Sequence, residues 1–284
     1  MIPHKFEYAA PDSLKSVLQL LDAGAKPLAG GMSLIPMMKL RLAAPEQLVD
    51  LGKVKELGYI RESGDSIHIG AMTTHYEIET SPVLLRKCPL LAETAAEIGD
   101  LQVRNRGTIG GSVAHADPSA DYPAALQALE ARLVLIGAQR ERTVSAADFF
   151  VDAFTTSLEP GELVREVIVP AEGSETGTCY EKVVQPASGF AIVGIAVRVR
   201  RNGGKISFVR IGVTGLSNRS YRATAAEAAL AGKSGSAEDV RSSAALVAQG
   251  VDANSDLHAS ANYRKHLATV HAARAISAAL SRTA

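Results

Sequence analysis

The sequence predicts an α+β fold for this chain of 284 residues, and three features indicate it. Near the N-terminus, a helix, a short strand, a Gly-Gly pair and a second helix follow one another. In the middle, strands of hairpin type alternate with helical segments. In the last third, a strong β-hairpin precedes three alanine-rich helical segments, so strands and helices are segregated and do not form regular βαβ units.

Residues 1–57 are expected to form a first subdomain. Pro11 opens its first helix, with Asp12 or Ser13 as the N-cap, and Gly24 ends it. Pro36 falls in the first turn of the next helix, where proline is tolerated. The elements after the first helix are a strand over Lys26–Ala29, a helix over Ser33–Leu42 and a buried strand over Gln47–Leu51.

Residues 58–173 are expected to form a second subdomain. It opens with a hairpin, because two alternating segments flank the turn-forming Ser63-Gly-Asp65. Helices over Thr74–Thr80 and Leu90–Ile98 follow, then a glycine-rich loop, a helix over Ser119–Leu129, a strand over Arg132–Ile136 and a closing strand over Leu163–Val169. The stretch Ala171–Gly177 is predicted to be a linker.

Residues 178–284 are expected to form a C-terminal sheet-and-helix domain. The segments Ala191–Arg200 and Ile206–Val213 flank Asn202-Gly-Gly, which favours a β-hairpin. Helical segments are predicted over Thr224–Ala231, Ala237–Gln249 and Ala261–Leu280.

Two glycine-rich segments are the most informative part of the sequence. The first glycine segment is Lys26–Leu34 and the second is Arg104–Ser112; in each, an apolar residue leads into Gly-Gly and a serine follows. Paired glycines let the backbone approach a ligand and expose successive N–H groups. Two such segments would suit a long ligand with a central diphosphate, and ordinary turns are the alternative.

Composition excludes several classes of function. Acidic and basic residues are equal in number, at 30 each, so no net field attracts nucleic acid or an anionic membrane. No apolar run approaches the ~18 residues of a membrane helix, and no signal-peptide core is visible, so we expect a cytoplasmic protein. Two cysteines, Cys88 and Cys179, cannot build a [2Fe–2S] centre. The seven histidines show no metal-ligand spacing, so no metal site is expected and any redox cofactor would be organic.

The residues around both glycine pairs resemble one family. Ala29–Arg41 is similar to the first FAD loop, and Gln102–Asp121 to the second, of the flavoprotein medium subunits of molybdenum hydroxylases, which include carbon monoxide dehydrogenase and xanthine dehydrogenase. The likeness extends from Phe6 and Pro11 to the C-terminal helices. It implies a two-part FAD-binding region of the vanillyl-alcohol-oxidase (PCMH) type, followed by the C-terminal flavoprotein domain.

The resemblance also implies the residues that bind FAD without a covalent bond. Those of the two glycine segments are Ala29, Gly30, Gly31, Met32, Ser33 and Leu34, with Thr108, Ile109, Gly110, Gly111 and Ser112 on the other side of the diphosphate and ribityl chain. Met32 stands where many relatives carry His or Gln, which removes a polar contact and a possible histidine attachment point. Hydrophobic filler is an equal alternative for Met32.

Other residues are implied around the flavin ring. Asp121 matches a carboxylate that binds the nucleotide, and Lys182 matches a lysine that reaches the ring, where its charge would stabilise the anionic reduced form. Phe190 matches an aromatic residue over the ring, although Gly189 replaces the acidic residue often found before it. Ile98 and Val164 would line the pocket. The alternatives are a solvated Lys182, core roles for Phe190, Ile98 and Val164, and helix capping for the nearby Asp117.

The resemblance implies an FAD-carrying subunit of an oxidoreductase, with no catalytic acid, base or nucleophile of its own. A molybdopterin-containing large subunit would oxidise the substrate, and a small subunit with [2Fe–2S] centres would relay electrons to the FAD, in a dimer of heterotrimers. Two alternatives stay open: a self-sufficient FAD oxidoreductase of the same fold, and a non-catalytic nucleotide-binding assembly subunit. The substrate is not identified, and the acceptor stays open among quinone, NAD and dioxygen.

Overall fold

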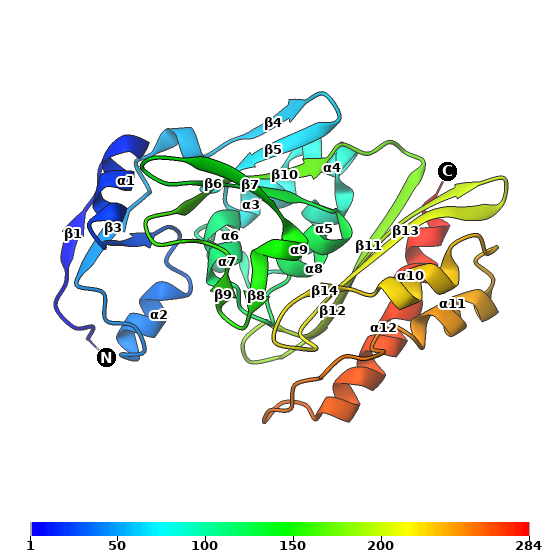
Figure 1. Cartoon of the computed structure of the whole chain (residues 1–284). Helices are drawn as coiled ribbons and strands as arrows, with labels where there is room; N and C mark the ends of the chain where they lie inside the picture. Colours follow the sequence, from blue (N-terminus) through cyan, green and yellow to red (C-terminus); the bar gives the residue numbers. More distant parts are fainter. Residues whose placement is uncertain (1, 284) are drawn as a thin grey trace.

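The computed structural model describes residues 2–283, which form three regions in chain order (Figure 1). In the N-terminal region, Ser13 caps the first helix by accepting a hydrogen bond from the Ser16 N–H, and Gly24 follows that helix with a φ of +94°. The three strands of the N-terminal region form a parallel sheet in the order β1-β3-β2. The elements are β1 (Glu7–Ala9), α1 (Leu14–Asp22), β2 (Lys26–Leu28), α2 (Leu34–Lys39) and β3 (Gln47–Asp50).

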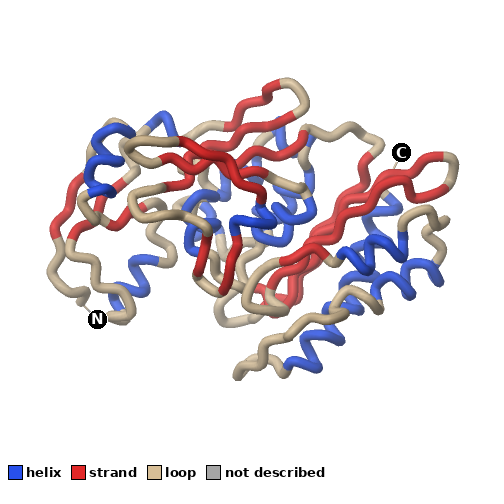
Figure 2. The backbone as a smooth tube through the Cα atoms, in the orientation of Figure 1, coloured by secondary structure: helices blue, strands red, loops and turns tan. Residues whose placement is uncertain are grey.

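The middle region is built on a five-stranded antiparallel sheet in the order β4-β5-β10-β6-β7, with its helices packed against it (Figure 2). The elements of the sheet are β4 (Ile60–Ser63), β5 (Ser66–Gly70), β6 (Arg132–Ile136), β7 (Glu141–Ser145) and β10 (Leu163–Pro170). The remaining elements are η1 (Lys55–Leu57), α3 (His75–Thr80), α4 (Pro82–Lys87), α5 (Pro89–Ala96), α6 (Leu101–Arg104), α7 (Ile109–His115), α8 (Tyr122–Ala128), α9 (Ala146–Phe149), β8 (Phe150–Asp152) and β9 (Thr155–Thr156).

The middle region differs from the sequence prediction around the second glycine segment. The expected loop is partly helical, because Gly110 and Gly111 lie in the first turns of α7, which Thr108 caps by accepting from the Gly111 N–H. The helix predicted from Ser119 begins only at Tyr122. Asp117 does not cap it: its Oδ1 accepts from the Ser119 N–H at 2.8 Å and so closes a turn before the helix.

The C-terminal region is a four-stranded antiparallel sheet with α10–α12 on one side (Figure 1). The predicted hairpin and the last helix are present, whereas α11 ends five residues earlier than its predicted end at Gln249. The elements are β11 (Thr176–Val184), β12 (Ala191–Asn202), β13 (Lys205–Thr214), β14 (Tyr221–Arg222), α10 (Thr224–Leu230), α11 (Ala237–Ala244) and α12 (Ala261–Ser281).

The middle and C-terminal regions are joined tightly. Helix α8 packs on β12 and β13, and a β-carbon on Gly212 would collide with the carbonyl oxygen of Ala124, so the glycine permits the close approach. The predicted linker is shorter than expected and anchored, since Glu172 is buried and its Oε1 accepts from Arg198 Nε at 2.8 Å. This packing fixes β11 next to the end of α5, where several of the predicted site residues lie.

Three clusters of buried apolar side chains form the core, and each draws most of its residues from one region. The three units with boundaries at 57/58 and 173/178 stay predictions.

Candidate functional site

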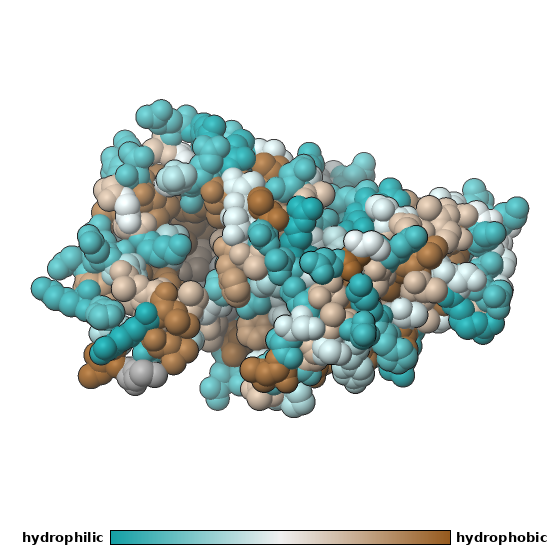
Figure 3. Space-filling view, turned by 60° about the horizontal axis from the view of Figure 1, so that its bottom comes forward, coloured by the Kyte–Doolittle hydropathy of each residue, from teal (hydrophilic) through white to brown (hydrophobic). Residues whose placement is uncertain are grey.

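The two glycine segments lie against each other in the fold. A β-carbon on Gly30 would collide with the carbonyl oxygen of Arg106, and one on Gly111 would lie 3.5 Å from the β-carbon of Ala29. Segments more than 70 residues apart in the sequence therefore meet with their backbones in close approach. Figure 3 shows the surface hollowed between the N-terminal region, at the left, and the middle of the molecule.

The first glycine segment presents unused main-chain donors. Gly31 has a φ of +78°, a conformation that favours glycine. None of the N–H groups of residues 30–33 donates a hydrogen bond to another residue between 2 and 283, and the Ser33 side chain forms no capping bond. Met32 is 40% exposed and thus is not core filler. Consecutive free N–H groups in such a turn form a concave binding site for an anion.

The main-chain donors of the second glycine segment are used within the fold. The N–H groups of Ile109 and Gly110 donate to the carbonyl oxygens of Thr73 and Ala71, at 3.0 and 2.9 Å, and the Gly111 N–H donates to Thr108 Oγ1. A side chain on buried Gly110 would collide with Ala71. These donors are already satisfied, so the segment supplies close packing and the partly exposed surface of Gly111 and Ser112.

Lys182 and Asp121 form a buried ion pair. Lys182 Nζ lies 2.9 Å from Asp121 Oδ2, and the side chains are 1% and 5% exposed. The lysine is therefore not a solvated strand residue. Its ammonium also donates to the carbonyl oxygen of Glu97 at 2.7 Å, and the Tyr180 hydroxyl donates to Asp121 Oδ1 at 2.6 Å. Burial raises the pKa of Asp121 to about 6, against the opposing effects of Lys182 and Tyr180.

The apolar residues predicted around the ring lie in different settings. Val164 is in the core of the middle region, and Ile98 is half-buried beside that core. Phe190 is 40% exposed on the β11–β12 turn and is therefore not a core residue. Gly189, just before it, has a φ of +74°, and a β-carbon there would lie 3.5 Å from the Cα of Gly99. The turn that carries Phe190 thus lies beside the turn that carries Ile98.

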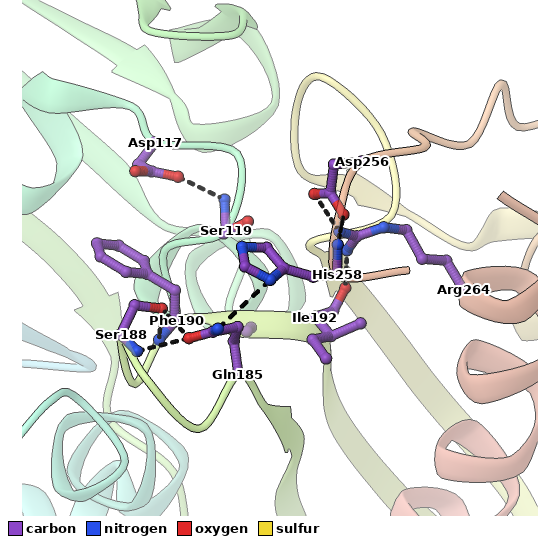
Figure 4. Close-up of a pocket in the computed structure, with 10 residues that line it drawn as sticks. Asp117, Ser119, Gln185, Ser188, Phe190, Ile192, Asp256, His258 and Arg264 are labelled. Atoms are coloured by element: carbon purple, nitrogen blue, oxygen red, sulfur yellow. Dashed lines mark hydrogen bonds and ion pairs between the residues drawn. The ribbon is translucent and has the colours of Figure 1, made fainter. Parts of the chain in front are cut away.

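A pocket of about 180 Å³ opens beside Phe190 (Figure 4). Asp117 and Ser119 come from the segment before α8, Gln185 from the β11–β12 turn, and His258 from the loop before α12. Gln185 Nε2 lies 3.4 Å from His258 Nδ1. Neither glycine segment lines this pocket.

Two side chains of the site have no counterpart in the sequence prediction. Tyr180 lies two residues before Lys182 on one strand, and this spacing, which puts both side chains on the same face, was a usable signal. Arg104 contacts Glu79 and the turn after α5. No local pattern marks it, because its partners are at least five residues away.

In the part of the chain between residues 2 and 283, no three His, Cys, Asp or Glu side chains are grouped so that they could hold a metal ion. Over the same residues, no helix has the length and apolar character needed to cross a membrane.

Comparison with known proteins identifies the family. Residues 4–172 match the family described as FAD binding domain in molybdopterin dehydrogenase, and residues 178–279 match the CO dehydrogenase flavoprotein C-terminal domain. The carbon monoxide dehydrogenase medium chain of Hydrogenophaga pseudoflava is 42% identical over 100% of both chains. The glyceraldehyde dehydrogenase medium chain of Sulfolobus acidocaldarius is 36% identical over 95% of this chain and 96% of its own.

A solved structure agrees with these matches. It is a carbon monoxide dehydrogenase from Hydrogenophaga pseudoflava that lacks the Mo-pyranopterin moiety of its cofactor, and it superposes with a TM-score of 0.97 at 44% identity, covering 100% of both chains. The chain therefore belongs to the FAD-binding medium subunits of the molybdenum hydroxylase family, the group that contains the carbon monoxide dehydrogenase medium chains.

Proposed function

We propose that this chain holds one FAD non-covalently and passes electrons from a partner subunit to an external acceptor. The observation that carries the proposal is the run of free N–H groups over residues 30–33, in a chain whose residues 4–172 match an FAD-binding family. Those donors fit a diphosphate, which needs several hydrogen bonds and little bulk. When bound, FAD would supply the redox chemistry.

The protein's part is to bind and orient the cofactor and to set its electrostatics. The first glycine segment would hold the diphosphate, and Gly111 and Ser112 would border the same ligand from the second segment. Lys182 and Asp121 would lie toward the ring, with Ile98 and Phe190 as its apolar neighbours; Val164 would support this wall from the core. These assignments follow the family pattern, and the close approach of the two glycine segments supports the one for the diphosphate.

The partners in this proposal are a molybdenum-containing large subunit and an iron–sulfur small subunit, assembled as a dimer of heterotrimers. The names of the relatives support it, since they are medium chains of dehydrogenases. The two names refer to different substrates, which agrees with a substrate site on another subunit. We place the complex in the cytoplasm, where a reducing environment would keep the two buried thiols free.

Purification of the complex from its native host tests the proposal. We expect three polypeptides, iron and molybdenum, and one FAD for each copy of this chain. Acid precipitation should release all yellow colour into the supernatant, because neither glycine segment contains a histidine or cysteine. A colourless protein that rejects added FAD would contradict the proposal. An active flavoenzyme of one polypeptide without iron or molybdenum would favour a self-sufficient oxidoreductase.

A further inference from the structure

Arg104 connects three parts of the middle region. Its Nε donates to Glu79 Oε2 on α3 at 2.8 Å. Its Nη1 lies 3.1 Å from the carbonyl oxygen of Gly99 and 3.3 Å from that of Ile98. The side chain is only 16% exposed, so these are not the contacts of a freely moving surface arginine. A planar guanidinium with several donors can hold separate acceptors in a fixed geometry, which a lysine cannot reproduce.

The turn of residues 97–99 is held from both sides. Lys182 of the C-terminal region donates to the carbonyl oxygen of Glu97, and Arg104 of the middle region donates to the next two carbonyl oxygens. Two cationic side chains therefore satisfy the three successive carbonyl oxygens of residues 97–99, just after α5. Gly99 has a φ of +52°, and its Cα faces Gly189 of the turn that carries Phe190. The position of this turn therefore sets how Ile98 lies relative to Phe190.

Arg104 lies directly before the backbone on which the first glycine segment rests. It is the last residue of α6, and the N–H groups of Arg106 and Gly107 both donate to the carbonyl oxygen of Val103 just before it. The Arg106 carbonyl and Gly107 are the groups that Gly30 approaches. A shift of α6 would displace the Arg106 carbonyl and Gly107. It would therefore change the spacing between the two glycine segments.

We propose that Arg104 is a positioning residue of the flavin site. Its guanidinium fixes both the turn that carries Ile98 and the backbone that supports the first glycine segment, so that one side chain aligns the ring end and the diphosphate end of the site. This inference rests on the proposed function. Arg104 itself would not touch FAD; it would act through Ile98, Gly99 and the Arg106 carbonyl.

The test compares Arg104→Gln, Arg104→Lys and the control Arg86→Gln, which changes an exposed arginine on α4. Each purified complex is freed of FAD and titrated with it. We expect the dissociation constant for FAD to rise about tenfold for Arg104→Gln, as the loss of charge-assisted hydrogen bonds would produce. Arg104→Lys should restore part of the affinity, and Arg86→Gln should bind FAD as the wild type does. The visible circular dichroism of the bound flavin should change only in the Arg104 variants.

Thermal unfolding of the FAD-free proteins separates positioning from general destabilisation. The inference is overturned if Arg104→Gln binds FAD with wild-type affinity and spectrum. It is also overturned if Arg104→Gln unfolds at a much lower temperature without FAD while Arg104→Lys binds FAD normally, since a structural role would then account for the loss. Failure of the wild-type complex to bind FAD would instead contradict the proposed function.

Discussion

Lys182 and Asp121 meet as an ion pair with a separation of 2.9 Å between Nζ and Oδ2, although 61 residues separate them in the sequence. Both were expected to act on FAD separately. In the fold, the lysine charge is already compensated by a carboxylate that Tyr180 also holds. The field at a flavin beside this pair would therefore depend on the pair and not on the lysine alone, because the two opposite charges lie 2.9 Å apart and partly cancel each other.

Lys182→Met should lower the reduction potential of the bound flavin, and Asp121→Asn should raise it. The first change leaves a buried carboxylate that disfavours the anionic reduced ring, and the second leaves an uncompensated ammonium that favours it. One charge interaction of about 1.4 kcal/mol corresponds to about 59 mV for one electron, so shifts of tens of millivolts are expected. Potentiometric titration at pH 8, where Asp121 favours its ionised form, measures both.

Tyr180→Phe is the matched control for this pair, because it keeps both charges and removes only the hydrogen bond to Asp121 Oδ1. We expect a shift smaller than either charge change. If all three variants keep the wild-type potential within error, the pair does not lie near the ring.

Gly111→Val should reduce FAD content while leaving the protein folded. A β-carbon at Gly111 meets only Thr108 Oγ1, at 3.0 Å, and the Ala29 β-carbon, at 3.5 Å, so the added methyl groups would occupy the surface between the two glycine segments. Gly110→Val should instead destabilise the fold, because it forces the side chain into Ala71, and overpacking typically costs about 1–3 kcal/mol. Flavin absorbance and thermal unfolding separate the two effects.

Ala114→Val, at an exposed position of the same helix, controls for the general effect of valine on α7. Normal flavin content in Gly111→Val would mean that the second glycine segment serves packing alone.

Elements with a strong local pattern could be predicted from the sequence. The hairpin of β12 and β13 follows from its alternation and its Asn202-Gly turn, and Ser13 and Gly24 mark the ends of α1. Helix α7 could not be predicted, because a Gly-Gly pair disfavours a helix. The packing of Gly110 against Ala71 and the Thr108 cap override this preference.

The family pattern names the candidate site residues, which stay predictions, whereas the contacts between their side chains could not be predicted. Family pattern marks Asp121 and Lys182, but nothing local indicates that their side chains meet. A run of free N–H groups was expected in both glycine segments. Only the first segment has one, over residues 30–33. Whether an N–H is free depends on which carbonyl lies opposite, and for Gly110 that carbonyl belongs to Ala71, nearly 40 residues earlier.

Both cysteines should resist thiol reagents in the native protein. Cys88 is fully buried, and burial raises the pKa of its thiol to about 12; Cys179 is 4% exposed, with a pKa raised to about 11 by burial. The reactive thiolate is therefore scarce at neutral pH. Ellman's reagent at pH 7.5 should label neither thiol until guanidinium unfolds the chain, after which both react. Ser188→Cys, at an exposed turn position, provides the reactive control, and fast labelling of the wild type would contradict this assignment.

The stability of the FAD-free chain should depend on His75 below pH 6.5. His75 is buried, forms a hydrogen bond with the Tyr122 hydroxyl at 3.1 Å, and has its pKa lowered to about 4, mainly by burial and also by the charge of Arg104. The unfolded chain takes up a proton at about pH 6.5, so between pH 6.5 and 4 it binds more protons than the folded chain, and stability falls as pH falls. From pH 7 to 5 this contribution should decrease by about 2 kcal/mol.

Asp121 opposes this trend in the same range, because its folded-state pKa of about 6 lies above its unfolded value and its contribution increases as pH falls. The comparison therefore uses the difference in unfolding free energy between the wild type and His75→Gln, in which the Asp121 contribution cancels. We expect the wild type to lose about 2 kcal/mol relative to His75→Gln between pH 7 and 5 in urea unfolding. His266→Gln, a change at an exposed histidine, is the control. A constant difference across this range would mean that His75 titrates normally in the folded chain and is not held neutral beneath the second glycine segment.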